Sequence, residues 1–339
     1  MNKNAFDPEV YEFYKSAIDG AGFSAAINSA DIDRLREIEI TSHVAHLDPY
    51  ESAEKHDIIA ERSGADPLQL RVYVPERDGK AACGLPVLLY FHGGGFIMGS
   101  IADHDPLCGK LADECGALVI APEYRLAPEH PFPACIEDAV FTAEWAVNNA
   151  HLYGGDPCRL LAGGDSSGAN IAAVLALLAS SSGKAGNNCN YCKTGNNCKA
   201  DKVPELSGLI LLYGVYGCKS LAEYESAKLY GDGSCVLPLD AIDTMMDLYV
   251  PEGTDMDDFR LNPGRSSDLR GMPPAVVVTA EFDPLRDDGE DFARKLEEAG
   301  NKVKLIRMDG MMHGFALYWQ RFSKAKKLLE EIGRMSKSF

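Results

Sequence analysis

The chain alternates short apolar segments with helical patterns over most of its 339 residues. The segment at 85–94, LPVLLYFHGG, is continuously apolar and ends in glycine, as expected of a strand buried on both faces of a sheet. Six further segments have strand patterns: 68–76, 117–125, 159–165, 206–214, 274–283 and 302–310. Helical patterns occupy 133–150, 167–180, 287–299 and 317–336. This alternation predicts an α/β protein with a mostly parallel, doubly wound sheet.

Two segments interrupt the alternation. Residues 180–205 form a polar stretch in which Gly-Asn-Asn-Cys occurs twice, and residues 216–260 carry helix and turn patterns between two predicted strands. Helical patterns also precede the first strand, within residues 1–50. We therefore expect an α/β core at 51–215 and 261–339 that contains the polar loop of 180–205. Residues 1–50 and the insertion at 216–260 would together form a helical cap.

The chain is strongly acidic, with 51 acidic and 33 basic residues and a formal net charge of −18. Nucleic acids and anionic membranes attract clustered lysine and arginine, so this balance argues against both as partners. No segment approaches the roughly 20 apolar residues of a membrane span or shows a signal-peptide pattern. The ten cysteines are scattered along the chain. We expect a protein of the reducing cytoplasm, and the oligomeric state stays open, with a homodimer as one alternative.

The segment at 159–180, RLLAGGDSSGANIAAVLALLAS, places a glycine turn between a strand and a helix. Gly164 and Gly168 flank Ser166 two residues away on each side, which gives the pattern G-x-S-x-G. A serine on so sharp a turn leaves no room for side chains at those positions, so the pattern is typical of a nucleophile elbow. The alternative is phosphate binding at the helix N-terminus. That alternative lacks the lysine of a phosphate loop and would place Asp165 beside an anion.

A nucleophilic serine needs a general base and an acid that orients the base. In the chain order that accompanies G-x-S-x-G, both follow the serine. His313 is the only histidine after Ser166, and it lies on a predicted loop. The nearby acidic residues are Glu281, Asp283, Asp287 and Asp288. We select Asp283 because it directly follows the strand AVVVTAEF, where sites in open α/β sheets gather.

Three consecutive glycines, Gly93, Gly94 and Gly95, follow His92 at the end of the strand at 85–94. Glycines let the backbone turn with its N–H groups facing a common point, as an oxyanion hole requires. For this segment alone, the alternative is a flexible glycine turn. A loop of this type combined with G-x-S-x-G is the known signature of lipases and esterases, so the combination favours the oxyanion hole.

Five motifs occur in order between residues 91 and 315: HGGGF, EYRLAPEHPFPA, GGDSSGAN, EFDPLRD and HGF. In these motifs the chain resembles the hormone-sensitive-lipase-like branch of the α/β-hydrolase carboxylesterases. The resemblance implies an α/β-hydrolase fold with a sheet of about eight strands, flanking helices and a helical cap. It also implies that Ser166 is the nucleophile, Asp283 the orienting acid and His313 the general base.

The resemblance further implies roles for the residues around this triad. The implied oxyanion hole consists of the glycines Gly93, Gly94 and Gly95 and the backbone N–H of Ser167. Among these glycines the second and third are favoured as donors, with the first in the turn. His92 is implied to anchor the loop, and Glu123 and Arg125 to brace the loops beneath the site. Ser167 departs from the alanine that is usual in this branch.

Cys189, Cys192 and Cys198 lie in the polar loop and form the larger departure from the family pattern. The spacing Cys-x-x-Cys is typical of soft-metal sites, but a structural zinc site usually has four ligands and no histidine lies nearby. The favoured alternative is a solvated insertion whose cysteines are incidental. We therefore expect no metal and no cofactor.

Together these features predict a serine carboxylester hydrolase that acts on short- to medium-chain acyl esters through an acyl-enzyme intermediate. Its partner would be a small-molecule ester. An amidase, a lactonase or a deacetylase would use the same triad, and these alternatives stay open. A non-catalytic receptor similar to the plant gibberellin receptors is disfavoured, because those receptors have the catalytic histidine replaced and His313 is present here. The cap carries apolar side chains expected to enclose the substrate: Phe13, Tyr14, Met245, Met246 and Leu248.

Overall fold

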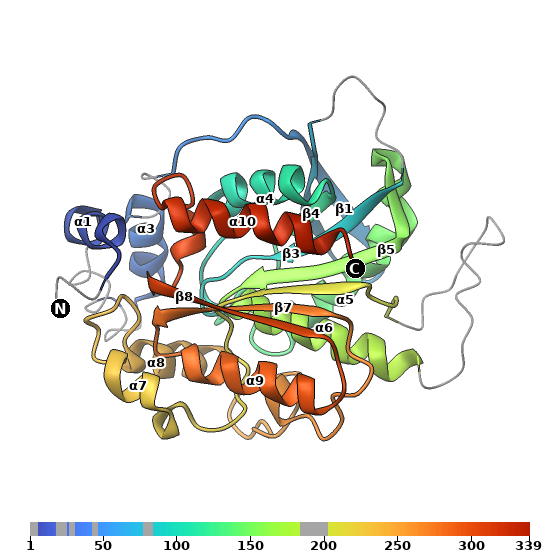
Figure 1. Ribbon diagram of the computed structural model, residues 1–339. Coiled ribbons are helices and arrows are strands. Elements are labelled where there is room, and N and C mark those ends of the chain that lie inside the picture. The colour runs from blue at the N-terminus through green and yellow to red at the C-terminus, as the bar shows by residue number, and fades with distance from the viewer. Residues whose placement is uncertain (1–5, 18–25, 27–30, 43–46, 77–83, 184–202) are drawn as a thin grey trace.

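Eight strands form a single sheet in this computed structural model, which describes residues 6–17, 26, 31–42, 47–76, 84–183 and 203–339. The spatial order is β1-β2-β4-β3-β5-β6-β7-β8 (Figure 1). The strands are β1 (Glu54–Arg62), β2 (Ala65–Val74), β3 (Leu85–Phe91), β4 (Leu118–Pro122), β5 (Gly155–Asp165), β6 (Gly208–Leu212), β7 (Ala275–Phe282) and β8 (Val303–Met312). β1 pairs antiparallel with β2, and β2 with β4, whereas all other pairs are parallel. The prediction of a mostly parallel sheet is confirmed.

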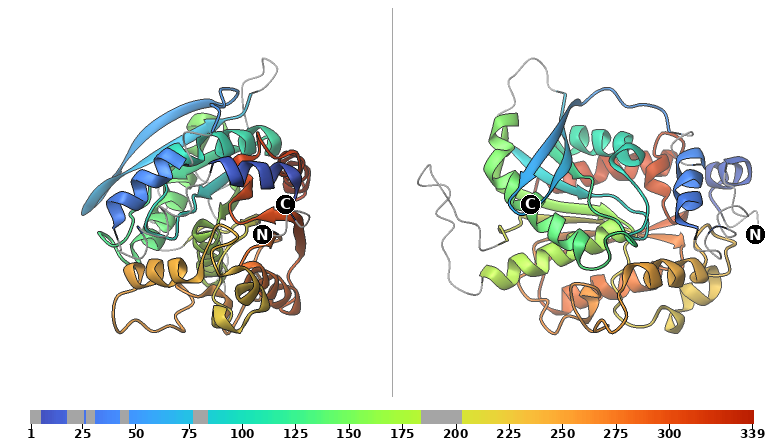
Figure 2. Two further views of the ribbon diagram at one scale, coloured as in Figure 1. Left: turned by 90° about the vertical axis from the view of Figure 1, so that its left-hand side faces the viewer. Right: turned by 180° about the vertical axis from the view of Figure 1, so that it is seen from behind.

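Helices cover both faces of the sheet. The α-helices are α1 (Pro8–Ala17), α3 (Ile32–Ser42), α4 (Ile101–Cys115), α5 (Ala134–Asn149), α6 (Ser167–Gly183), α7 (Glu225–Tyr230), α8 (Leu239–Tyr249), α9 (Arg286–Glu298) and α10 (Ser323–Ser336). Short 3-10 helices are η2 (Ala150–Tyr153), η4 (Leu221–Glu223), η5 (Pro263–Arg265) and η6 (Phe315–Tyr318). α4 and α10 lie on one face, and α5, α6 and α9 on the other (Figures 1 and 2). The sheet is therefore doubly wound, as predicted.

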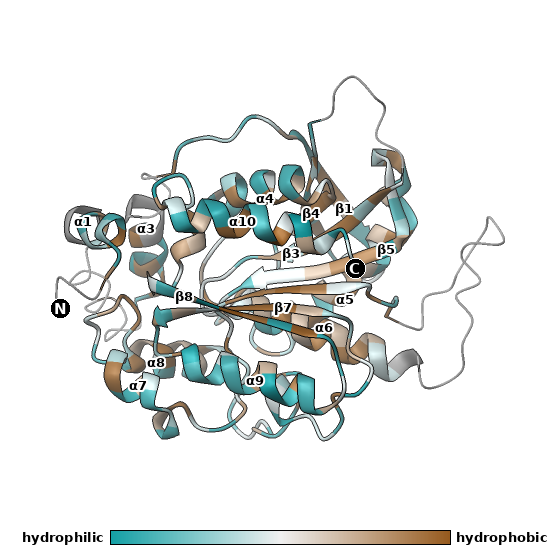
Figure 3. Cartoon of the chain, in the orientation of Figure 1, coloured by the Kyte–Doolittle hydropathy of each residue, from teal (hydrophilic) through white to brown (hydrophobic). Residues whose placement is uncertain are grey.

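The central strands are apolar throughout because helices cover them on both sides. In β3, Leu88 and Tyr90 pack in the core beneath α4 and α10, whereas Val87, Leu89 and Phe91 pack in the core beneath α5 and α6. This separation follows from the alternation of side chains along a strand. Figure 3 shows the contrast with the edge of the sheet, where β7 is mostly apolar and buried, whereas its outer neighbour β8 mixes polar with apolar side chains and is buried only at its end.

Two elements, α4 and β1, are absent from the sequence prediction. α4 contains Pro106 and buries the polar side chains of Asp103 and His104, so apolar spacing does not mark its inner face. β1 lies at the edge of the sheet and buries only Ala60, so it lacks the alternation of a half-buried strand. The predicted C-terminal helix also begins late, because η6 precedes α10 and the α-helix starts at Ser323.

Four helices gather at the end of the sheet toward which β7 and β8 point (Figure 1). α1 and α3 come from residues 1–50, and α7 and α8 come from residues 216–260. The N-terminal segment attaches to β8 through the Asp7 N–H, which donates to the Gly310 carbonyl oxygen at 3.1 Å. Both segments expected to form a cap therefore lie at the same end of the sheet.

Six cysteines lie within the described residues. Five of them are free thiols (Cys108, Cys115, Cys135, Cys218 and Cys235), whereas Cys158 is disulfide-bonded. Free thiols are usual in reducing compartments and disulfides in oxidising ones, so the cytoplasmic location stays a prediction. Among the helices of the described ranges, none has the length and apolar character needed to cross a membrane.

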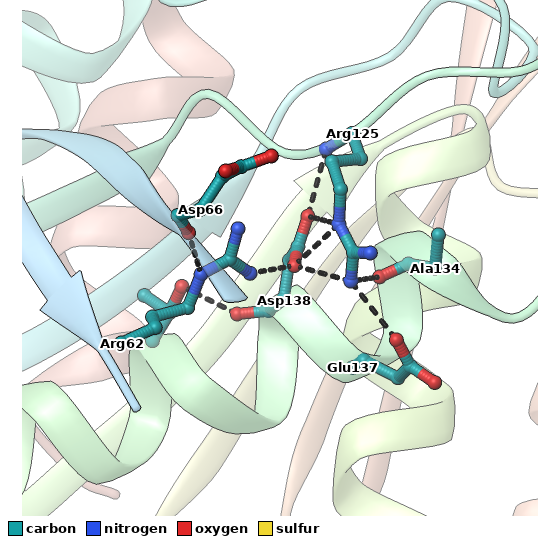
Figure 4. Close-up of polar contacts among 7 residues, drawn as sticks. Arg62, Asp66, Arg125, Ala134, Glu137 and Asp138 are labelled. Atoms are coloured by element: carbon teal, nitrogen blue, oxygen red, sulfur yellow. Dashed lines mark hydrogen bonds and ion pairs between the residues drawn. The ribbon is translucent and has the colours of Figure 1, made fainter. Parts of the chain in front are cut away.

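A buried carboxylate on α5 joins three parts of the core (Figure 4). Asp138 is fully buried and accepts a hydrogen bond from the guanidinium of Arg62 at the end of β1. It also accepts from the backbone N–H of Arg125 at 2.8 Å and from its Nε at 3.0 Å. Arg125 Nη2 further donates to Ala134 O at 3.1 Å and to Glu137 at 2.9 Å. Arg125 thus braces the loop after β4 against α5, and Arg62 adds the β1–β2 hairpin to the same carboxylate.

We predict that Asp138→Asn lowers the free energy of unfolding by about 3–5 kcal/mol, because it leaves two guanidinium groups beside a buried site without their carboxylate. Denaturant unfolding followed by circular dichroism measures the change. Glu137→Gln is the matched control, since Glu137 also pairs with Arg125 but its side chain is 62% exposed. The control is expected to cost about 1 kcal/mol or less. Equal losses in the two variants would contradict the central role of Asp138.

Candidate active site

Ser166 lies on the sharp turn between β5 and α6. Its φ is 53°, in the left-handed region that non-glycine residues rarely adopt. The backbone N–H of Ser166 donates to the Leu212 carbonyl oxygen of β6 at 2.9 Å, which holds the turn in place. Strain of this kind persists only where the surroundings enforce it, and it is typical of functional sites.

The glycines on either side of Ser166 are required by close backbone packing. A Cβ added at Gly168 would lie 2.5 Å from the His92 carbonyl oxygen and closer still to that of Phe91. A Cβ added at Gly164 would lie 2.5 Å from the Phe91 carbonyl oxygen. These oxygens belong to the end of β3 and the residue that follows it, so G-x-S-x-G lets the serine turn lie directly against the neighbouring strand.

His313 connects Ser166 to a buried acid. Its Nε2 lies 2.9 Å from Ser166 Oγ, and its Nδ1 lies 2.8 Å from Asp283 Oδ2. A carboxylate can only accept, so Nδ1 carries the proton and Nε2 is left to accept from the serine hydroxyl. Asp283 is fully buried, and its other oxygen accepts the Leu285 N–H at 2.8 Å. The structure therefore brings the three predicted triad residues into one hydrogen-bonded chain.

Backbone donors lie on both sides of this chain. The glycine loop, residues 93–99, follows β3, and Ser167 opens α6. The N–H groups of Gly94, Gly95 and Ser167 donate to no residue that the structure describes. Gly93 differs, because its N–H donates to Asp165 Oδ1 at 3.1 Å and is therefore already engaged. Among the three glycines expected at the oxyanion hole, Gly93 is therefore the one whose N–H already has an acceptor.

Asp165 contacts residues that sequence reasoning did not single out. Its buried carboxylate accepts from the Tyr90 hydroxyl at 3.0 Å and lies 3.1 Å from His104 Nε2. Burial alone would raise the pKa of Asp165, but the charge and hydrogen bond of His104 and the hydroxyl of Tyr90 lower it overall. The carboxylate therefore stays ionised while it holds Gly93. The sequence does not indicate a role for His104, because this residue lies on α4, a helix with no clear apolar spacing.

His92 directly precedes the glycine loop, and its side chain is buried. Its ring stacks on Tyr124 with a centroid distance of 4.1 Å, and its Nδ1 lies 2.7 Å from the Gly93 carbonyl oxygen. Burial lowers the pKa of His92 to about 3, so the ring is neutral. Glu123 accepts the Ile101 N–H at 3.0 Å at the start of α4. These contacts agree with the anchoring and bracing roles implied by the family resemblance.

α8 packs directly on the glycine loop. A Cβ added at Gly95 would overlap the sulfur of Met245, and the Phe96 ring stacks on Tyr249 at a centroid distance of 4.0 Å. The expected cap residue Phe13 packs against η6. Its ring lies 4.5 Å from that of Tyr318, so it fastens α1 to η6.

The prediction about the cysteine loop cannot be placed, because Cys189, Cys192 and Cys198 lie outside the described residues. Within the described ranges, no three His, Cys, Asp or Glu side chains are grouped so that they could hold a metal ion.

The comparisons with known proteins agree with this geometry. A family model described as alpha/beta hydrolase fold matches residues 88–317. The chain is 37% identical over 259 residues to carboxylesterase NlhH of Mycobacterium tuberculosis (strain CDC 1551 / Oshkosh). The matched region covers 74% of this chain and 72% of that protein. It is 33% identical to the structure of ester-hydrolase EH1AB1 from the metagenome of Lake Arreo, with a TM-score of 0.82 over 98% of both chains. Gibberellin receptor GID1A of Arabidopsis thaliana is 31% identical over 241 residues, which cover 69% of this chain and 63% of the receptor. The chain therefore belongs to the alpha/beta hydrolase fold family, in its hormone-sensitive-lipase-like carboxylesterase branch.

Proposed function

We propose that this carboxylesterase hydrolyses short- to medium-chain acyl esters, with Ser166 as nucleophile, His313 as general base and Asp283 as the acid that orients it. One observation carries the proposal. The imidazole of His313 lies 2.9 Å from Ser166 Oγ on one side and 2.8 Å from Asp283 Oδ2 on the other. This arrangement gives the serine hydroxyl a base within proton-transfer reach.

In the first half of the reaction, Ser166 Oγ attacks the carbonyl carbon of the ester while its proton passes to His313 Nε2. The carbonyl π electrons move to oxygen and give a tetrahedral oxyanion. The N–H groups of Gly94, Gly95 and Ser167 would stabilise this charge, and each such donor is worth about 3 kcal/mol. Asp283 stabilises the imidazolium that forms and keeps the ring in the productive tautomer.

Collapse of the tetrahedral species breaks the bond to the alcohol. His313 donates its proton to the departing alkoxide, so the alcohol leaves neutral and an acyl ester on Ser166 remains. A water molecule then gives a proton to His313 and attacks the acyl carbon through a second oxyanion. Collapse releases the carboxylic acid and returns the proton to Ser166, so no cofactor is consumed.

We further propose that residues 1–50 and 216–260 act as a cap over this site. The contact of Met245 with Gly95 supports this role, because it brings an apolar side chain of α8 to the glycine loop. Met246 and Leu248 of the same helix are half-buried. An apolar lining of this kind favours the acyl or alcohol group of an uncharged ester.

Two alternatives to ester hydrolysis are a related hydrolase activity and a receptor function. An amidase, lactonase or deacetylase would use the same three side chains and differ only in the groups that the cap accepts. A receptor function has a specific observation against it, because His313 is bonded to both Ser166 and Asp283, as turnover requires.

We predict that Ser166→Ala and His313→Ala each lower kcat for p-nitrophenyl butyrate by about 10⁴-fold or more, since the triad acts as a unit. Stopped or continuous absorbance assays of p-nitrophenol release measure the loss. Ser181→Ala is the matched control, because Ser181 lies near the other end of α6 and its hydroxyl bonds only to the Leu177 carbonyl oxygen among the described residues. Turnover by Ser166→Ala at the wild-type rate would rule out the proposed mechanism.

We predict that kcat/KM across p-nitrophenyl esters from acetate to palmitate is highest for short to medium acyl chains. The reason is that α8 lies against the glycine loop and places Met245 beside Gly95, one of the proposed oxyanion donors. A few amides and lactones assayed in parallel test the related hydrolase activities. A maximum at palmitate would contradict the acyl preference, and faster turnover of the amides or lactones would favour the alternative substrates.

A further inference from the structure

Arg36 of α3 donates hydrogen bonds to the glycine loop and to the loop after β4. Its Nε donates to the Ile97 carbonyl oxygen at 3.0 Å, and its Nη2 donates to the Ala127 carbonyl oxygen at 3.2 Å. Arg36 comes from residues 1–50, whereas both acceptors belong to the α/β core. A single guanidinium therefore connects the N-terminal segment with the loop that carries the proposed oxyanion donors.

The carbonyl oxygens of the glycine loop are held by hydrogen bonds from different directions. The Gly94 oxygen accepts from the N–H groups of Ile97 and Met98 at 3.2 and 3.0 Å. The Phe96 oxygen accepts from the Ala127 N–H at 2.9 Å. The Ile97 oxygen accepts from Arg36. Because each peptide unit is planar, holding the Ile97 carbonyl fixes the Met98 N–H, which donates to the Gly94 oxygen, and holding the Gly94 carbonyl in turn fixes the Gly95 N–H.

Glu129 holds the guanidinium of Arg36 in place. Arg36 Nη1 lies 2.8 Å from Glu129 Oε1, and Nη2 lies 2.9 Å from Oε2, so the ion pair is bidentate. The hydrogen bond with Arg36 lowers the pKa of Glu129 to about 2, so its carboxylate stays ionised at neutral pH. A planar guanidinium can bind two carboxylate oxygens and two carbonyls at once, whereas a lysine ammonium has only three donors and no fixed plane.

We propose that Arg36 is a positioning residue for the esterase reaction, which holds the Ile97 carbonyl and, through the Met98 N–H and the Gly94 carbonyl, keeps the Gly95 N–H set for the oxyanion. This inference rests on the proposed function above. Charge on the oxygen develops only after Ser166 attacks, so the loss of Arg36 acts on the transition state and leaves ester binding nearly unchanged. Residues 1–50 thereby contribute to the rate of the chemical step.

The test compares Arg36→Met with Arg34→Met in the full-length chain. Arg34 lies on the same helix, and its ion pair with Glu37 is on the surface, with side chains 52% and 60% exposed. We expect Arg36→Met to lower kcat for p-nitrophenyl butyrate by about ten- to a hundredfold, with KM within about twofold of wild type. We expect Arg34→Met to match wild type and Arg36→Lys to recover only part of the loss.

A second readout separates positioning from a general structural effect. A trifluoromethyl ketone forms a tetrahedral adduct with the serine and places an oxyanion in the same position as the reaction does. Its inhibition constant should rise by the same factor by which kcat falls in Arg36→Met. An unchanged inhibition constant, a kcat no lower than that of Arg34→Met, or a higher KM at unchanged kcat would each overturn the proposal.

Glu129→Gln keeps the inference testable if Arg36→Met does not fold. This variant leaves Arg36 and the two carbonyl acceptors in place and weakens only the group that orients the guanidinium. We expect the same split, with a smaller fall in kcat and an unchanged KM, and a wild-type kcat would overturn the proposal. Ser166→Ala distinguishes a failure of the proposed function from a failure of the proposed role of Arg36. If it stays active, the proposed function fails, and if it is inactive while Arg36 variants match wild type, only the inference about Arg36 fails.

Discussion

The site depends on the close approach of β3 and β5 at their carboxyl ends. These strands pair in parallel, so the glycine loop and the serine turn leave the sheet side by side. At Gly168 the backbone of one segment lies so near the carbonyl oxygens of the other that a single methyl group would not fit. The donors of Gly94 and Gly95 and the hydroxyl of Ser166 can therefore share one small space. Asp283 and His313 follow β7 and β8 and complete the chain from the other side of the turn.

A buried charge fixes how the two loops meet. Asp165, next to the nucleophile, binds the Gly93 N–H of the glycine loop and the His104 ring of α4. An ionised carboxylate without partners would be very costly in this place, so the arrangement forms only when all of its donors are present. The same bond engages the Gly93 N–H and leaves the N–H groups of the next two glycines without an acceptor among the described residues. One acidic residue in the elbow thus connects the packing of the loops with the amides that we propose as oxyanion donors.

Features that depend on neighbouring residues can be predicted from the sequence, whereas features that depend on residues far apart in the chain cannot. The elbow glycines, the glycine loop and the acid and histidine after the serine are set by local backbone geometry and chain order, so the sequence could indicate which three side chains form the hydrogen-bonded chain. His104 contacts Asp165 and Arg36 contacts Ile97, and in each pair the two residues are 61 positions apart in the sequence. No local sequence pattern therefore identifies either residue. α4 and β1 were missed for a related reason, because a buried polar face and an exposed edge both lack the apolar periodicity that identifies helices and strands.

The N-terminal segment acts on both halves of the proposed machinery. Its Asp7 N–H donates to the Gly310 carbonyl oxygen, three residues before the proposed general base His313. Its Arg36 donates to the Ile97 carbonyl oxygen, two residues after the proposed oxyanion donor Gly95. Catalysis requires its reacting groups to be held within a fraction of an ångström, so contacts at both points are suited to influence turnover. The proposed role of residues 1–50 therefore extends from covering the site to holding the groups that would react in it.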